Sequence, residues 1–124
     1  MITKHNTAET NELLARAACG DQEVLGQLLD RDRSRLRRMV ALRIDRRLNG
    51  RIDPSDVIQE AQLEAADRLT EYLRNPTMPF FLWMRLITGQ RLVALHRRHL
   101  GAQLRDAGRE VSLDRPGLPQ ATSA

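Results

Sequence analysis

Two histidines in this sequence have a spacing that could support metal chemistry. His96 and His99 lie three positions apart, so on a helix both imidazoles would lie near one face. A metal site needs further acidic or histidine ligands, but the residues between them are arginines and the only other histidine is His5. Cys19 has no nearby histidine to activate its thiol. We therefore expect no metal, no cofactor and no catalytic residue, and the chain is predicted not to be an enzyme.

A second group of residues suits binding. Three of the four aromatic residues follow Pro79 within one helical turn, and polar and basic side chains come after them. Aromatic rings can stack on bases, polar groups can read a base edge, and arginines can hold phosphates. Aromatic residues at a helix start more often belong to the core. We expect Phe80 and Phe81 to be mainly structural, and Trp83 to serve both the core and binding.

The elements that must position these residues are all predicted to be helices. Apolar residues recur at three- and four-residue steps, and no segment alternates as a strand would. Five consecutive polar residues, 30–34, allow a break in the second helix. Residues 54–73 follow an aspartate that can cap them, and prolines separate them from the last helix, which could extend toward Ala107. The sequence predicts a compact all-α bundle of three to four helices: 8–18, 21–48, 54–73 and 80–100.

Composition limits the class of protein. The chain has 124 residues, of which 41% are hydrophobic and 29% charged, as expected for one soluble globular domain. No apolar run is long enough to span a membrane, and the first residues form no apolar signal segment. The single cysteine excludes an intramolecular disulfide. These features favour a cytoplasmic protein with no membrane partner.

Charge is unevenly distributed along the chain. Residues 31–51 contain nine arginines and two aspartates, whereas the helix 54–73 contains five acidic residues and one arginine. Residues 85–109 contain six arginines and one aspartate. Charge runs alone are more often solvated helix faces. The functional interpretation is an acidic ridge for a basic protein partner and basic surfaces for nucleic acid.

The last predicted helix has several distinct faces. One apolar side, which includes Trp83 and Ile87, should face the core, and a second apolar side lies roughly opposite. We therefore expect the start of this helix to be enclosed on most sides. The second side consists of Leu82, Leu86, Val93 and Leu100. Three arginines have no acidic neighbour within a turn and are expected to contact phosphates, namely Arg91, Arg97 and Arg98.

At these residues the sequence resembles a known family. The segments DPSDVIQEAQLEA, PFFLWMRLITGQRL and LHRRHLGAQLRDA are similar to the second conserved region of bacterial sigma factors of the extracytoplasmic-function (ECF) class. The N-terminal LLARAACGDQEVLGQLLDR also fits the helix, Gly-Asp and second helix with which that class opens. The resemblance covers about residues 12–108, and it is carried by the order and spacing of the motifs.

The resemblance implies two binding functions. The acidic helix would dock on the clamp helices of the largest subunit of the RNA polymerase core, through Asp56, Gln59, Glu60 and Glu64. The loop before the last helix, and that helix, would bind the non-template strand of the promoter minus-ten element and capture an extruded base. The residues expected to contact DNA are Arg74, Asn75, Trp83, Arg85, Gln90, Arg91, Arg97 and Arg98. Ala94 would flank the base pocket, Gln90 stands where the family usually has asparagine, and Arg85 stands where an aromatic residue is frequent.

The resemblance also sets the expected domain organisation. Residues 1–108 would form the region-two domain and residues 109–124 a linker or tail, while the helix-turn-helix domain of such factors is absent from this chain. Either the chain is an excised domain or the natural protein is unusually short, and an end within the expected linker favours the excised domain. An anti-sigma factor is a further partner class that the resemblance admits. The alternative function is a sigma-like decoy that binds protein only, which would need the acidic ridge but not the basic helix.

Overall fold

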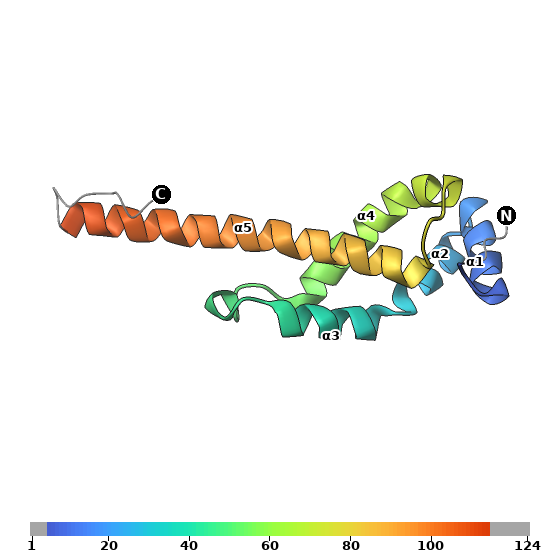
Figure 1. Ribbon diagram of the computed structural model, residues 1–124, viewed down its shortest axis with the longest axis horizontal. Coiled ribbons are helices and arrows are strands. Elements are labelled where there is room, and N and C mark those ends of the chain that lie inside the picture. The colour runs from blue at the N-terminus through green and yellow to red at the C-terminus, as the bar shows by residue number, and fades with distance from the viewer. Residues whose placement is uncertain (1–4, 115–124) are drawn as a thin grey trace.

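The computed structural model describes residues 5–114, and for residues 108–114 it describes the backbone only. No strand occurs in this part of the chain, so the prediction of an all-α fold is confirmed (Figure 1). The number of helices is larger than the three to four predicted. The elements are α1 (Ala8–Ala18), α2 (Gln22–Asp30), α3 (Arg33–Arg43), the short 3₁₀ helix η1 (Arg46–Leu48), α4 (Pro54–Arg74) and α5 (Phe80–Asp114).

Three of the helices begin with a side-chain cap. The side-chain oxygens of Thr7, Asp21 and Asp53 accept hydrogen bonds from backbone amides in the first turns of α1, α2 and α4. Such caps satisfy amides that have no partner within the helix. Pro54 opens α4, where a missing amide hydrogen costs nothing. The sequence predicted the cap and the proline of α4, whereas it did not single out the caps of α1 and α2.

The helix predicted over residues 21–48 is divided into three pieces. The first break, between α2 and α3, lies within the polar run 30–34. The second break was not predicted. Helix α3 ends at Arg43 because Ile44 is extended (ψ 129°) and the Asp45 amide donates to His96 Nε2 of α5, at 3.2 Å. The Asp45 carboxylate then caps η1 and pairs with Arg47, which lowers the pKa of Asp45 to about 2.

One hydrophobic core joins the helices. Helix α4 packs against both α3 and α5, and α1 packs against α2. Figure 1 shows α5 crossing α4 and extending well beyond the other helices. The buried side of α4 consists of the apolar positions expected from helical spacing: Val57, Ile58, Ala61, Ala65, Leu69, Tyr72 and Leu73.

The loop between α4 and α5 is held by the N-terminal segment. The Asn6 side chain donates to Tyr72 Oη at 2.9 Å and accepts from the Phe80 amide at 2.8 Å. Tyr72 Oη in turn donates to the Met78 carbonyl at 2.6 Å. Burial raises the pKa of Tyr72, so its hydroxyl stays a donor at neutral pH. The N-terminal segment and the end of α4, which are distant in sequence, thereby fix the start of α5.

Helix α5 is longer than predicted. Its backbone remains helical past residue 100 and past the expected domain boundary at residue 108, and it ends at Asp114. The last ten residues of the predicted tail, 115–124, lie outside the described part of the chain. Among the described helices, none combines the length and apolar character needed to cross a membrane.

Candidate nucleic-acid interface

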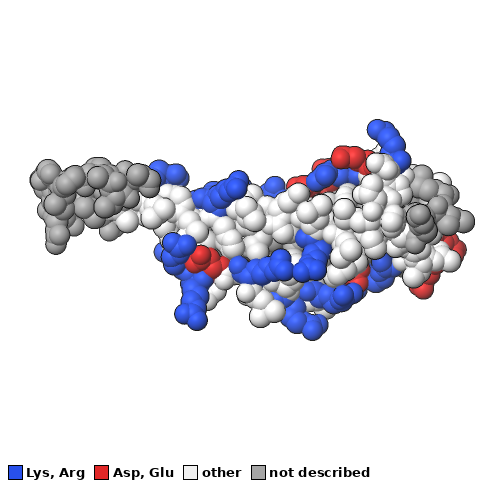
Figure 2. Space-filling view, in the orientation of Figure 1, with Lys and Arg blue, Asp and Glu red and all other residues white. Residues whose placement is uncertain are grey.

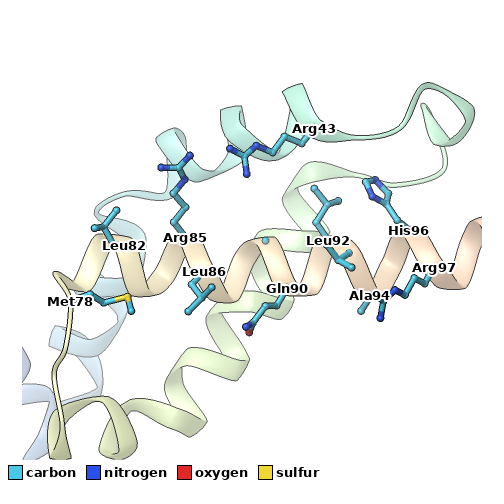
Figure 3. Close-up of a pocket in the computed structure, with 12 residues that line it drawn as sticks. Arg43, Met78, Leu82, Arg85, Leu86, Gln90, Leu92, Ala94, His96 and Arg97 are labelled. Carbon is cyan, nitrogen blue, oxygen red and sulfur yellow. The ribbon is translucent and has the colours of Figure 1, made fainter.

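An open groove runs along α5, on a side of the helix that α4 leaves uncovered (Figure 3). Its volume is about 900 Å³. The apolar part of its surface comes from Leu82, Leu86 and Val93, whose side chains are 43%, 47% and 48% exposed. The expectation that this second apolar side of α5 is enclosed is therefore wrong. Helical spacing shows that these residues share a side, but it does not show whether another element covers that side.

Polar and basic side chains surround the apolar surface. Arg85, Gln90 and Arg97 of α5 are exposed and line the groove. Arg43 reaches the same groove from α3, and Figure 3 shows Arg85 extending from α5 toward α3. No carboxylate of the described residues lines the groove. Three residues expected to contact DNA thus lie together around one apolar surface, beside an arginine that the sequence did not single out.

Two further residues of the expected DNA-binding set lie at the end of α4. Arg74 is the last residue of α4 and Asn75 follows it, and both are exposed. Neither lines the α5 groove, although Met78 of the same loop does. Arg98 is exposed on α5 but also lies outside the groove lining. The geometry therefore separates these three residues from Arg85, Gln90 and Arg97.

Trp83 lies inside an aromatic cluster. Its ring centroid is 4.8 Å from that of Tyr72 and 5.6 Å from that of Phe80, and the residue is 7% exposed. Its ring faces are thus occupied by neighbours of the core, and Trp83 does not line the groove. Phe81 is half-buried, with the Arg35 guanidinium 4.0 Å from its ring centre. The structural role expected for Phe80 is confirmed by its burial.

Arg91 points toward α4 and is engaged there. Its guanidinium nitrogens lie 2.7 Å from a Glu60 oxygen and 3.6 Å from a Glu64 oxygen, and its buried Nε has no hydrogen-bond partner in the described part of the chain. The expectation that phosphates are its partners rested on the absence of acidic neighbours along its own helix. The acidic neighbours come from α4 instead. Arg91 therefore holds α5 to α4 in this structure.

The acidic ridge of α4 contains two kinds of residue. Asp56 and Gln59 are exposed, and Asp56 forms no ion pair with any described residue. Glu60 and Glu64 are half-buried and pair with Arg91. Leu63, which is 64% exposed, lies on the same side of the helix by its spacing from Asp56 and Gln59. The sequence could have identified Leu63 as an exposed residue, because it is a leucine that lies outside the apolar stripe of α4.

The two charges are segregated on the surface. Figure 2 shows lysine and arginine side chains spread over α3 and α5, with acidic side chains gathered mainly over α4 and at the end that carries the N-terminal helices. Among the described residues, which include His96 and His99, no group of three His, Cys, Asp or Glu residues could hold a metal ion. His96 Nε2 instead accepts the hydrogen bond from Asp45.

Comparison with known proteins adds no assignment. The sequence matches no protein-family model, and neither a curated protein nor a solved structure is significantly similar to it. The functional proposal therefore rests on the residues and their geometry.

Proposed function

We propose that this chain is a sigma-factor domain of the region-two type, which binds the RNA polymerase core and the non-template strand of the promoter minus-ten element. The observation that carries the proposal is the α5 groove, where an exposed apolar surface is bordered by Arg43, Arg85, Gln90 and Arg97 and by no carboxylate of the described residues. Proteins that hold single-stranded nucleic acid combine a positive groove with surfaces on which bases can pack. The resemblance of the sequence to ECF sigma factors supports the same function.

In this proposal the groove residues divide the work by chemistry. Leu82, Leu86 and Val93 give an extruded base an apolar surface. The Gln90 amide offers both a donor and an acceptor to the base edge, and Arg85 and Arg97 bind the flanking phosphates. Trp83 acts from the core, since its packing against Tyr72 and Phe80 fixes the start of the helix that carries the groove.

The second half of the proposal concerns α4. Asp56, Gln59 and Leu63 form an exposed surface that combines a negative charge, an amide and an apolar centre, a combination suited to a basic helical partner. The clamp helices of the polymerase are that partner in the proposal. Glu60 and Glu64 support the surface by joining α4 to α5 through Arg91. The same proposal places the protein in the cytoplasm, where the polymerase acts.

A decoy that binds polymerase without DNA is the second candidate. A decoy requires the α4 surface only. The unpaired arginines around an exposed apolar groove would then have no function and would raise the electrostatic self-repulsion of the fold. This observation favours the DNA-binding function over the decoy.

The test uses Asp56→Lys, because Asp56 has no ion pair in the described part of the chain and its replacement breaks none. Glu60→Lys is less suitable, since it also destroys the contact with Arg91. Loss of a charged pair at an interface costs about 2 kcal/mol or more, so we expect affinity for the polymerase core to fall about 30-fold or more. Glu23→Lys, an exposed charge reversal on α2, is the matched control and should bind normally. Equal affinity of both variants and the original protein would reject the polymerase-binding half of the proposal.

A further inference from the structure

Apart from Arg43, the arginines of α3 are not used by the function proposed above. Helix α3 carries five arginines in eleven residues and no acidic residue. Like charges three and four positions apart on a helix destabilise it, so this composition does not serve the stability of α3. Only Asp32, just before the helix, offers local compensation, at 3.9 Å from Arg35.

Four arginines meet in a hollow between α3 and α5. The hollow has a volume of about 360 Å³ and is lined by Arg35, Arg38, Met39, Leu42, Arg43 and Arg85. In the part of the chain that the structure describes, no carboxylate lines it. Arg38, Arg43 and Arg85 form no ion pair with any residue that the structure describes. The hollow is therefore a site of concentrated positive charge, and among the described residues the ion pairs offer its arginines only Asp32, at 3.9 Å from Arg35, as a counter-charge.

Two features show what kind of anion fits. Arg43 and Arg85 line both this hollow and the α5 groove, so the two surfaces are continuous. Leu42, at the edge of the hollow, is 82% exposed, which gives an apolar contact beside the arginines. A small inorganic anion would use the charge alone. A nucleic-acid strand presents phosphates for the arginines and sugar or base surfaces for Leu42.

We propose that the α3–α5 hollow binds the phosphate backbone of the DNA strand that leaves the α5 groove, with Arg38 as a phosphate contact that lies outside the groove itself. This inference rests on, and extends, the DNA-binding half of the proposed function. It extends the DNA site along α3, from Arg43 at the groove to Arg38. It also gives the unusual composition of α3 a function, because arginines that destabilise the helix bind the strand.

The test compares two arginines of the same helix. Arg38 lines the hollow, whereas Arg37 donates to Ser55 Oγ on α4 at 3.0 Å and does not line it. Both are exposed, so Arg38→Gln and Arg37→Gln remove the same charge from neighbouring positions. Fluorescence anisotropy would measure binding of labelled single strands of about 5 and about 15 nucleotides, a range that spans the site sizes of single-strand binding folds.

We expect Arg38→Gln to weaken binding of the long strand and to lower its salt slope by about 0.7, the value for one phosphate contact on a single strand. Over a fourfold rise in salt, the variant should then lose about 2.6-fold less affinity than the original protein. Binding of the short strand, which the α5 groove can hold alone, should not change. Arg37→Gln should leave the salt slope for both strands unaltered.

Three outcomes would overturn the inference. The first is equal behaviour of Arg38→Gln and Arg37→Gln, and the second is an effect of Arg38→Gln that is as large on the short strand as on the long one. The third is displacement of the long strand by polyglutamate as effectively as by unlabelled DNA of equal charge. The last outcome would assign the hollow to an acidic protein. Failure of the inference is distinguishable from failure of the proposed function. Loss of polymerase binding is measured with Asp56→Lys and does not involve α3, and base preference is measured at Gln90.

Discussion

The contact between Arg91 and the acidic ridge allows a quantitative test of how α5 is held. Arg91→Met keeps most of the aliphatic stem of the side chain but removes its charge, leaving Glu60 and Glu64 one turn apart on α4. Arg68, 3.0 Å from Glu64, still compensates that carboxylate, so Glu60 loses its only ion-pair partner among the described residues. The useful quantity is the coupling between Arg91→Met and Glu60→Gln in a double-mutant cycle, which separates the pair from the other effects of each change.

The magnitude follows from the distance and the exposure. The pair is short, 2.7 Å, and the side chains of Arg91 and Glu60 are 28% and 40% exposed. Exposed ion pairs contribute about 0.2–1 kcal/mol, and breaking a fully buried pair costs about 3–5 kcal/mol. Solvent screening at Glu60 places this pair nearer the exposed limit. We expect a coupling free energy of about 1 kcal/mol, decreasing at high salt.

The assay is urea unfolding followed by the fluorescence of Trp83, the only tryptophan in the chain. The matched control cycle replaces Glu60→Gln by Glu71→Gln, because Glu71 lies on the same helix, is 71% exposed and contacts Arg68 rather than Arg91. The control coupling should be within about 0.3 kcal/mol of zero. Equal coupling in the two cycles would refute the assignment of Arg91 to the contact between α4 and α5. Arg91 would then be available for the phosphate contact expected from the sequence.

Two other predictions concern stability. Trp83→Ala should lower the free energy of unfolding by about 3–5 kcal/mol, because it removes the central ring of the aromatic cluster. If that ring also positions the groove, a folded Trp83→Phe protein should open promoters poorly. Normal promoter opening by Trp83→Phe would limit Trp83 to a role in the core. The Arg47 contact lowers the pKa of Asp45 from 3.8 to about 2, so the stabilisation that it provides is present above about pH 4 and is lost as the pH falls toward 2. The difference in stability between the original protein and Asp45→Asn, from urea unfolding, should therefore decrease over that interval, and a constant difference would contradict this explanation.

Local patterns in the sequence predict the elements well where local interactions decide them. The cap of α4, the apolar side of α4 and the break within residues 30–34 all depend on residues within a turn or two of one another. The end of α3, in contrast, depends on a residue that is distant in the sequence. Ile44 and Leu48 continue the helical spacing, and the helix ends where it does because His96, 51 residues away, accepts from the Asp45 amide.

In the candidate site, too, spacing along one helix does not reveal contacts between helices. Gln90 and Arg97 could be grouped from the sequence because they lie seven positions apart on one helix, whereas helical spacing places Arg85 on a different strip of that helix. The pairing of Arg91 with Glu60 joins two helices, so spacing along α5 could not reveal it. Nor could spacing show that Leu82 stays exposed, since an apolar residue has the same pattern whether its cover is the core or a partner.

In the function that we propose, α5 reads a promoter strand while α4 is bound to polymerase. The most direct measurement is selection of single-stranded DNA, randomised over a short window, by the polymerase core with and without this domain, followed by sequencing of the bound strands. Our account predicts base preference at defined positions only when the domain is present. We further expect Gln90→Ala to relax the preference at one position, because losing a base contact costs about 1–3 kcal/mol on one sequence only. Arg97→Ala should instead weaken the binding of all sequences alike. Bound strands without base preference, or with the same preference in the absence of the domain, would contradict the account.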